Sequence, residues 1–256
     1  AWAVWALARA KEVGYPVDAA ALARGQAYLA DVVAAGQCER CGWGCEAPPD
    51  AVRVMALWTL ARTGAPRPSW LPALHEARAK LPLFAKALLA DAMYTGGGDR
   101  AAARKLLQEI LNHAKESPGG VHFEERDPRT WAPLWSSDVR TTAIVLGLLA
   151  TVSPDHPWVG KIARWLGTAR GSDGRWDSTQ EAAWALTALV EVVRGRERET
   201  PAFDATVRLA GEPLFSRRFE GRSMEIAKAE VPMARLQAAG AGALTIGKAG
   251  PGVLYY

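Results

Sequence analysis

The chain has 256 residues, 49% of them hydrophobic, and a net charge of +4 from 31 basic and 27 acidic residues. This length and composition can bury a substantial core in one large domain or one and a half. Charges of both signs are interspersed and no basic run is interleaved with aromatic residues, which argues against a nucleic-acid-binding protein. No apolar run reaches the length of a membrane span, and the first residues lack the basic-then-apolar pattern of a leader.

Residues 1–12 predict a helix that is already under way at the first position, with Trp2, Trp5 and Leu7 set among alanines. We therefore expect the chain to be a piece cut from a longer protein. Helices upstream would cover the surface around these three side chains, so the separate chain should expose it and self-associate or fray.

Two kinds of helix alternate along the first part of the chain. One kind is apolar on almost every face, and the other has a single apolar stripe. An inner ring of buried helices wrapped by half-exposed ones explains this alternation, which predicts a mainly α fold, an α/α toroid of helical hairpins. The all-round apolar helices are 1–12, 48–62, 83–94, 137–151 and 177–193, and the striped ones are 18–35, 69–79, 99–115 and 156–168.

A superhelical α-solenoid is the alternative fold, but its helices would more often share exposure equally. These segments give five inner and four outer helices, whereas a closed ring of six hairpins would need about twelve. We therefore expect an incomplete ring, with about three further helices upstream of Ala1.

Two of the inner helices begin alike, since Trp135-Ser-Ser-Asp can be laid over Trp176-Asp-Ser-Thr. In each copy a tryptophan precedes small hydroxyl residues and an acidic residue, so the internal repeat is a helical hairpin. We expect Ser178 or Thr179 to cap the second helix, because side-chain oxygens accept hydrogen bonds from the free backbone N–H groups there. Both helices are predicted to be buried on all sides. A weaker copy starts at Pro49.

Pro201 ends the last predicted helix, and the spacing of apolar residues changes after it. From Phe203 apolar residues alternate with polar or small ones, as in β-strands, and glycine-rich turns separate the segments. We therefore expect two domains, the toroid at 1–198 and a short, incomplete β-sandwich at 202–256. The predicted strands are Phe203–Leu209, Leu214–Phe219, Glu225–Val231, Ala243–Lys248 and Val253–Tyr256.

Cys38, Cys41 and Cys45 fall in one short loop with the spacing C-x-x-C-x-x-x-C. A zinc site would need four ligands, and no histidine or fourth cysteine is nearby in the sequence. A disulfide between two of the three, which would leave one cysteine over, and inert thiols are the other interpretations.

Glu124, Glu125 and Asp127 form an acidic cluster in the loop before Trp135. Paired carboxylates can perform acid–base chemistry, whereas charged residues before Pro128 are typical of a solvated loop. An enzyme would be favoured if these side chains turned inward around a deep pocket. The sequence contains no G-x-S-x-G motif, and nothing else pairs a nucleophile with a base.

The remaining motifs favour structural roles. The segment Tyr94-Thr-Gly-Gly-Gly-Asp99 follows a helix, which favours a hairpin loop ending in an Asp N-cap over a phosphate-binding loop. The eleven tryptophans lie mostly at hairpin ends or on inner helices, so core packing explains them better than sugar binding. The histidines, which form no H-E-x-x-H motif and no i, i+4 pair, are His75, His113, His122 and His156.

The chain resembles the later part of the thioester-containing toroid of bacterial alpha-2-macroglobulins. The resemblance covers most of the chain, and the helix start Arg-Trp-x-Ser-Thr-Gln is its most specific part. A related pattern occurs in terpene-cyclase toroids. The matching toroid segments are Trp135-Ser-Ser-Asp-Val-Arg-Thr-Thr-Ala, Pro154-Asp-His-Pro, Ile162-Ala-Arg-Trp-Leu and Gly174-Arg-Trp-Asp-Ser-Thr-Gln-Glu-Ala-Ala-Trp-Ala-Leu, and the tail adds Phe203-Asp-Ala-Thr-Val-Arg-Leu and Gly250-Pro-Gly-Val-Leu-Tyr-Tyr.

This resemblance implies a large, broad-spectrum protease-trapping inhibitor on the cell-envelope side of a bacterium, periplasmic or extracellular. Its partners would be target proteases and other domains of the same chain, and 202–256 would belong to a CUB or macroglobulin-like β-domain. In such proteins a protease cleaves a bait segment, and a thioester made from Cys and Gln of a C-x-E-Q motif can then link to the attacker.

The present sequence has no C-x-E-Q motif, because Cys38-Glu39 is followed by Arg40 and Cys45-Glu46 by Ala47. In the family the motif lies before the part matched here. We therefore assign no catalytic, cofactor-binding or metal-binding residue, and no cofactor.

Two other classes stay open. The first is an α/α-toroid enzyme, terpene-cyclase-like or polysaccharide-active, which the lack of a D-x-D-D motif and of an Asp/Cys/His zinc set disfavours. The second is an adhesion module that binds a protein partner through a face of the toroid. It would be favoured if the complete parent protein lacked both C-x-E-Q and a flexible bait-like segment.

Overall fold

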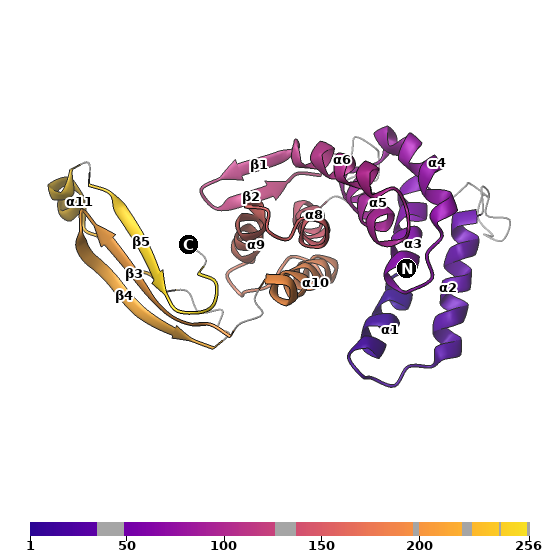
Figure 1. The fold of residues 1–256 in the computed structure, drawn as a ribbon, viewed down its shortest axis with the longest axis horizontal. Helices are drawn as coiled ribbons and strands as arrows, with labels where there is room; N and C mark the ends of the chain where they lie inside the picture. The colour runs from indigo at the N-terminus through magenta and orange to yellow at the C-terminus, as the bar shows by residue number, and fades with distance from the viewer. Residues whose placement is uncertain (35–48, 126–136, 197–199, 222–226, 241, 255–256) are drawn as a thin grey trace. The chain divides into compact units, whose positions relative to one another are not determined.

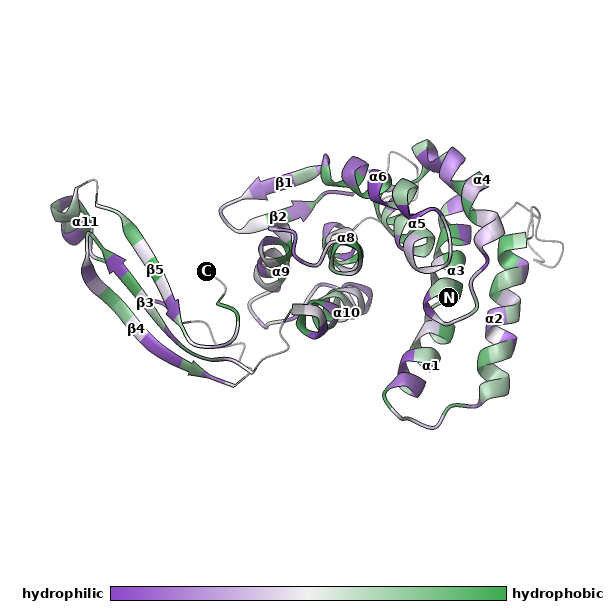
Figure 2. Cartoon of the chain, in the orientation of Figure 1, coloured by the Kyte–Doolittle hydropathy of each residue, from purple (hydrophilic) through white to green (hydrophobic). Residues whose placement is uncertain are grey.

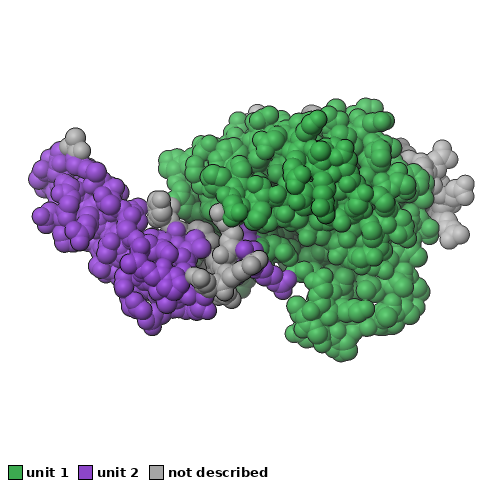
Figure 3. Space-filling view, in the orientation of Figure 1, with its two compact units in different colours: residues 1–191 green, residues 192–256 purple. Residues whose placement is uncertain are grey.

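The computed structural model describes residues 1–34, 49–125, 137–196, 200–221, 227–240 and 242–254. The chain divides into two compact units, Ala1–Glu191 and Val192–Tyr256 (Figure 3). In its described residues the first unit is helical apart from one hairpin, and the second is built on a small sheet (Figure 1). No helix in the described part of the chain is long and apolar enough to cross a membrane.

The helical unit alternates inner and outer elements, as the sequence pattern predicts. In chain order these are α1 (Trp2–Glu12), α2 (Ala19–Ala34), α3 (Asp50–Arg62), the 3₁₀ turn η1 (Pro68–Trp70), α4 (Leu71–Glu76), the 3₁₀ turn η2 (Ala77–Lys80), α5 (Leu83–Thr95), α6 (Arg100–Leu111), β1 (Ala114–Ser117), β2 (Gly120–Phe123), α8 (Asp138–Val152), α9 (Trp158–Thr168) and α10 (Thr179–Arg196), the last of which runs across the unit boundary.

The inner helices α3, α5 and α8 form the core. In α8, every residue from Arg140 to Leu146 is buried, and α5 is buried on most of its surface, so neither helix has a solvated face. The outer helices behave differently, because α6 and α9 bury only one stripe and carry hydrophilic residues beside it (Figure 2). The alternation of all-round apolar and striped helices therefore separates inner from outer elements correctly. The buried stripe of α9 is Val159, Ile162 and Leu166.

One of the predicted inner helices, α10, is less buried than expected. In α10, Leu186 is 55% and Val190 43% exposed, although Trp184, Ala185 and Ala188 are buried. Leu186 and Val190 are four residues apart, so one face of this helix is left open to solvent. The prediction that α10 is buried on all sides is wrong, because an apolar composition does not by itself supply a neighbour for every face.

The first helix packs by its tryptophans. Trp2 meets Trp184 edge to face at 4.8 Å between ring centroids, and Trp5 lies 6.1 Å from Trp58. Both side chains are half-buried, whereas Leu7 is 36% exposed. The expected exposure around these three residues is therefore found at Leu7 and only partly at the two indoles.

A hairpin that the sequence pattern does not predict follows α6. The helix predicted to reach Lys115 ends at Leu111, and β1 pairs antiparallel with β2. The hairpin packs on the helices through β2, where Val121 and Phe123 are buried. At its turn a Cβ on Gly120 would lie 2.3 Å from the carbonyl oxygen of Lys161, so only glycine allows this approach.

The second unit contains one antiparallel sheet in the order β4-β3-β5. The register places Phe203 opposite Phe219 and Val207 opposite Phe215 and Ile246, so one face of the sheet is apolar. The elements are β3 (Ala202–Leu209), β4 (Glu212–Glu220), α11 (Met233–Ala239) and β5 (Leu244–Ala249).

Three of the predicted strands are confirmed as β3, β4 and β5. The strand predicted at Glu225–Val231 is wrong for its described residues, because 227–231 hold no strand and α11 begins at Met233. Val253 and Leu254 also lie outside any strand. The described strands make a single sheet, so the two-layered sandwich stays a prediction.

Candidate functional site

Glu125 joins the N-terminal ends of two inner helices. Its carboxylate accepts hydrogen bonds from the backbone N–H of Leu83 at 3.0 Å and of Phe84 at 3.1 Å, the first two residues of α5. The hydroxyl of Thr141 on α8 donates to the same carboxylate at 2.7 Å. The residue is only 8% exposed. A negative charge at a helix N-terminus satisfies free N–H groups and complements the helix dipole, so Glu125 acts as the cap of α5 from a distant part of the chain.

Glu181 makes a second link, between α8 and α10. Its backbone N–H donates to the Ser178 hydroxyl, and the Ser178 N–H donates back to the Glu181 carboxylate, each at 3.2 Å. This reciprocal pair is a capping box. The Ser137 hydroxyl donates to the same carboxylate and accepts from Arg140 N at 3.0 Å, which makes Ser137 the N-cap of α8. The two copies of the sequence repeat thus cap their helices with equivalent serines, and Glu181 joins them.

Arg140 is a buried cation beside these carboxylates. It is 4% exposed, and its guanidinium carbon lies 4.3 Å from the centre of the Phe84 ring. Within the described part of the chain, Nε and Nη2 have no hydrogen-bond partner. Burial lowers the pKa of Arg140, and the nearby charges of Glu125 and Glu181 oppose that shift.

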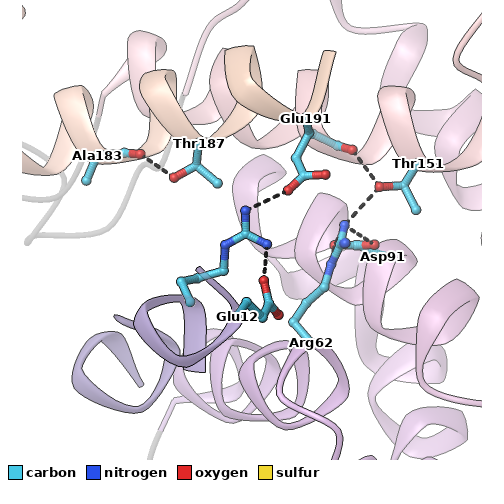
Figure 4. A network of polar contacts seen from close by, with 9 residues as sticks. Glu12, Arg62, Asp91, Thr151, Ala183, Thr187 and Glu191 are labelled. Atoms are coloured by element: carbon cyan, nitrogen blue, oxygen red, sulfur yellow. Dashed lines mark hydrogen bonds and ion pairs between the residues drawn. The ribbon is translucent and has the colours of Figure 1, made fainter. Parts of the chain in front are cut away.

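Asp91 lies toward the opposite ends of the inner helices. It is 4% exposed and accepts from Arg62 through two bonds, Nε at 2.8 Å and Nη2 at 3.0 Å. The indole N–H of Trp58 donates to it at 2.6 Å. Arg62 also donates to the Thr151 hydroxyl at 2.9 Å (Figure 4). Burial raises the pKa of Asp91, although Arg62 and the hydrogen bonds favour its ionised form. The network ties α3 to α5 and α8.

A cavity of about 150 Å³ opens beside this network. Side chains of α1, α3, α5, α8 and α10 line it, and Asp91, Arg62 and Trp58 form part of its wall. The polar groups here are held in donor–acceptor pairs, so the arrangement is suited to holding helices together and to binding. No three His, Cys, Asp or Glu side chains among the described residues are grouped as a metal site requires.

The acidic cluster predicted from the sequence is not assembled around this cavity. Glu125 is engaged at the start of α5, and Glu124 is half-buried. Asp127 lies outside the described residues, as do Cys38, Cys41 and Cys45 with all three interpretations of their loop. The one feature that would have favoured an enzyme, carboxylates turned into a deep pocket, is not supplied by Glu125.

The remaining motifs have the structural roles that their sequences indicate. Asp99 caps α6 by accepting from the N–H groups of Ala101 at 2.8 Å and Ala102 at 3.0 Å, and these bonds lower its pKa. His122 stacks on Trp165 with ring centroids 4.7 Å apart, and His156 accepts from Trp158 N at 3.1 Å.

The residues that the sequence reasoning missed are Arg62 and Asp91. A signal was available, because each is the single charge in the second half of its helix, where most of the other residues are apolar. A charge that must be buried with the rest of such a helix needs a partner of opposite sign. Glu191 stands out in α10 for the same reason.

Comparison with known proteins gives three kinds of match. Residues 69–192 match the family model of the A-macroglobulin TED domain. An alpha-2-macroglobulin homolog of Nostoc sp. is 30% identical over 261 residues, which cover 100% of this chain and 13% of that relative. The chain thus spans about an eighth of the length of that curated relative.

Solved structures of the same kind share the fold. Escherichia coli alpha-2-macroglobulin activated by porcine elastase is 23% identical with a TM-score of 0.58, covering 85% of this chain and 18% of that one. The native Escherichia coli protein from domain MG7 to its C-terminus is 21% identical with a TM-score of 0.56, covering 86% and 32%. Salmonella alpha-2-macroglobulin reacted with methylamine is 24% identical with a TM-score of 0.53, covering 85% and 14%.

Proposed function

Because the chain belongs to the alpha-2-macroglobulin family, and its helical unit has the α/α toroid fold of that family's TED domain, we propose that it is the scaffold of a protease-trapping inhibitor. The observation that carries this proposal is the similarity to an alpha-2-macroglobulin homolog along the whole chain. The protein that contains the chain acts as an endopeptidase inhibitor and not as an enzyme.

The descriptions of two relatives suggest how such a protein works. The Escherichia coli relative is described as activated by porcine elastase, and the Salmonella relative as reacted with methylamine. We transfer both properties to the parent of this chain, so that a target protease activates it and an amine-sensitive bond lies within it. Its target proteases and its own further domains are its partners, and its location is the periplasm or the cell envelope.

Within that protein the present chain holds the trapping region in place. It contributes no C-x-E-Q motif, so its role is mechanical. The carboxylates of Glu125, which is buried, and Glu181, which is half-buried, fix the starts of α5, α8 and α10 to one another. Asp91 with Arg62 joins α3 and α5 further along. Helices that are linked at both ends move as one body, as a platform for a reactive segment requires. Residues 202–256 belong to the β-domain that adjoins the toroid.

The test uses the full-length parent protein. It is treated with radiolabelled methylamine or left untreated, and each sample is incubated with a broad-specificity protease. Protease activity is then compared on a small peptide substrate and on casein. A trap screens the protease from the large substrate while leaving it active on the small one, and parent pretreated with methylamine is the matched control.

The outcomes separate two kinds of trap. Uptake of label, with protease linked covalently to the parent, indicates a thioester trap whose scaffold is this chain. No uptake, with protease still screened from casein, indicates a non-covalent trap. A protease that keeps full activity on both substrates and carries no attached parent contradicts the proposed function and favours an adhesion module or an enzyme.

A further inference from the structure

The proposed function uses the Asp91–Arg62 pair but assigns no role to the cavity beside it. Its lining residues come from α1, α3, α5, α8 and α10. Figure 4 shows Glu12, Arg62, Asp91 and Glu191, from four of these helices, close to one another. Its volume of about 150 Å³ is below the roughly 300–1,000 Å³ of pockets for drug-sized ligands, yet it exceeds the space of a single water molecule. The size suits one side chain or a small ion.

The charges around the cavity leave an excess of negative charge. Arg9 is shared by two carboxylates, Glu12 at 2.6 Å and Glu191 at 3.2 Å, while Arg62 is engaged by Asp91. The lining therefore holds Glu12, Asp91 and Glu191 against Arg9 and Arg62, which is one negative charge more than positive. Glu12 and Arg62 are the last residues of α1 and α3, so the C-terminal ends of these two helices add partial negative charge, roughly half a unit each. A further cation would be attracted here.

The walls and floor favour a cation with an apolar stem. The indoles of Trp5, Trp58 and Trp184 line the cavity, and aromatic faces attract ammonium and guanidinium groups. Leu88 and Ile144 supply apolar contacts. At Gly147, on the floor of the cavity, an added Cβ would find no atom within 4 Å, so the floor has room for at least one further carbon atom.

The ion pairs of Arg9 with Glu12 and Glu191, at the rim of the cavity, can be exchanged for pairs with a ligand. The side chains of Glu12 and Glu191 are 49% and 29% exposed, and that of Arg9 is 28% exposed. An ion pair at this level of exposure is worth only about 0–1 kcal/mol. Arg9 can therefore give up one carboxylate to an incoming cation, whereas the buried pair of Arg62 and Asp91 would stay intact.

We propose that the cavity between Trp58, Trp184, Gly147 and Glu191 is a binding site for an alkylguanidinium or alkylammonium group, the chemistry of an Arg or Lys side chain. The stem packs against the floor at Gly147, and the charged head shares Glu191 and Glu12 with Arg9. Arg9 occupies the carboxylates that a ligand would use, so it competes with the ligand. This inference does not depend on the proposed protease trap.

Isothermal titration calorimetry on the full-length parent tests this proposal. The probe is n-butylguanidinium, which stays protonated at neutral pH and therefore does not attack an acyl bond. The control ligand is N-butylurea, which has a similar shape and no charge. We expect saturable binding of the cation and binding of the urea that is weaker by about tenfold or more, the ratio that 1.4 kcal/mol of charge interaction gives.

Three variants at the cavity and one exposed control variant show whether the cation binds at this site. Glu191→Gln should weaken binding about tenfold by removing the excess charge, and Gly147→Leu should abolish it by filling the floor. Arg9→Gln should strengthen binding, since it removes the competitor. Glu116→Gln, an exposed change elsewhere in the unit, should have no effect, and circular dichroism melts of each variant show that it is folded.

Each outcome decides the matter. Equal affinity for the guanidinium and the urea, or binding that Glu191→Gln and Gly147→Leu leave unchanged, overturns the proposal. Weaker binding in Arg9→Gln also overturns it, because Arg9 would then be part of the receptor and not a competitor. Binding of N-acetylarginine methylamide in addition to n-butylguanidinium indicates a protein side chain as the source, and its failure with n-butylguanidinium still bound indicates a free small cation.

Discussion

The two ends of the inner helices are joined by different kinds of polar contact. At the N-terminal ends, the carboxylates of Glu125 and Glu181 accept hydrogen bonds from backbone N–H groups and hydroxyls. Toward the C-terminal ends, the guanidinium groups of Arg9 and Arg62 meet carboxylates, and a cavity remains between the helices. The carboxylates at the helix starts complement the helix dipole, which favours anions there.

The difference between the ends concerns geometry more than charge. Helix N–H groups are fixed on the backbone, so a carboxylate that satisfies them must be placed exactly where they point, and the helix starts are locked together. Arginine reaches its partner through a long side chain, which can bridge helices without closing the space between them. The same ring of helices is therefore tightly joined at one end and open to a ligand at the other.

The largest expected effect is at the C-terminal ends, for Asp91→Ala. This change would leave the Arg62 guanidinium without its carboxylate and the buried indole N–H of Trp58 without its acceptor. We expect the free energy of unfolding to fall by roughly 3–5 kcal/mol. Urea denaturation followed by circular dichroism measures the loss. Glu116→Ala, which breaks an exposed pair with Lys161, should cost at most about 1 kcal/mol. Equal losses for both variants would mean that the buried network does not hold α3 to α5.

At the N-terminal ends, Glu125→Ala should cost about 2–3 kcal/mol, because it leaves the N–H groups of Leu83 and Phe84 buried without acceptors. Glu125→Gln keeps one oxygen and should cost less. Amide hydrogen exchange gives the local signature, since the Leu83 and Phe84 amides should exchange faster in the alanine variant. Unchanged exchange at both amides would contradict the capping role of Glu125.

The serine caps give a smaller effect. Ser137→Ala and Ser178→Ala should each cost about 1 kcal/mol, the usual value for loss of an N-cap. Because both serines bond Glu181, the double variant should depart from the sum of the single losses, which a double-mutant cycle measures. Strict additivity would show that Glu181 does not couple the starts of α8 and α10.

Adding a methyl group at a glycine should have opposite effects beside the cavity, at Gly147, and in a packed contact, at Gly25. Gly147→Ala should stabilise the chain by about 0.5–1 kcal/mol, since alanine favours the helix and its methyl group enters the cavity without a clash. Gly25→Ala should destabilise it, because the new Cβ would lie 2.6 Å from Cγ2 of Val4. Thermal melts of both variants compare the two sites, and a destabilising Gly147→Ala would show that the cavity is closed at that position.

The smallest effect is expected at an outer helix and depends on pH. Hydrogen bonds from Ala102 N and Ala101 N lower the pKa of Asp99 from its ordinary value of 3.8. The ionised cap therefore stabilises the fold above pH 3.8, and this contribution disappears as the pH falls through the lowered pKa. The difference in stability between the natural chain and Asp99→Ala should shrink over that range. A difference that grows on acidification would contradict the capping of α6 by the carboxylate.

Much of the helical unit follows from the sequence. The predicted helix 83–94 is found at Leu83–Thr95, and 137–151 is found at Asp138–Val152, because all-round apolar composition and serine caps are local signals. The hairpin of β1 and β2 could not be predicted, since a strand of four residues is too short to show a clear alternation of apolar and polar residues. It is held by contacts with α8 and α9 that are distant in the sequence.

The site residues can be predicted where their partners are close in the sequence and not where they are distant. Ser178 and Asp99 are recognisable as caps because their partners lie two or three residues away. The sequence predicts only a loop cluster around Glu125, since its partners at Leu83 and Thr141 lie 42 and 16 residues away. The cavity depends on five helices meeting, which no short stretch of sequence describes.

Hydrogen–deuterium exchange of the full-length parent, before and after it captures a protease, tests the scaffold role most directly. If the chain is a platform that moves as one body, peptides covering α5, α8 and the first part of α10 keep their protection while the protease is held. Loss of protection in these peptides on capture would mean that the inner helices rearrange, and would contradict the scaffold role.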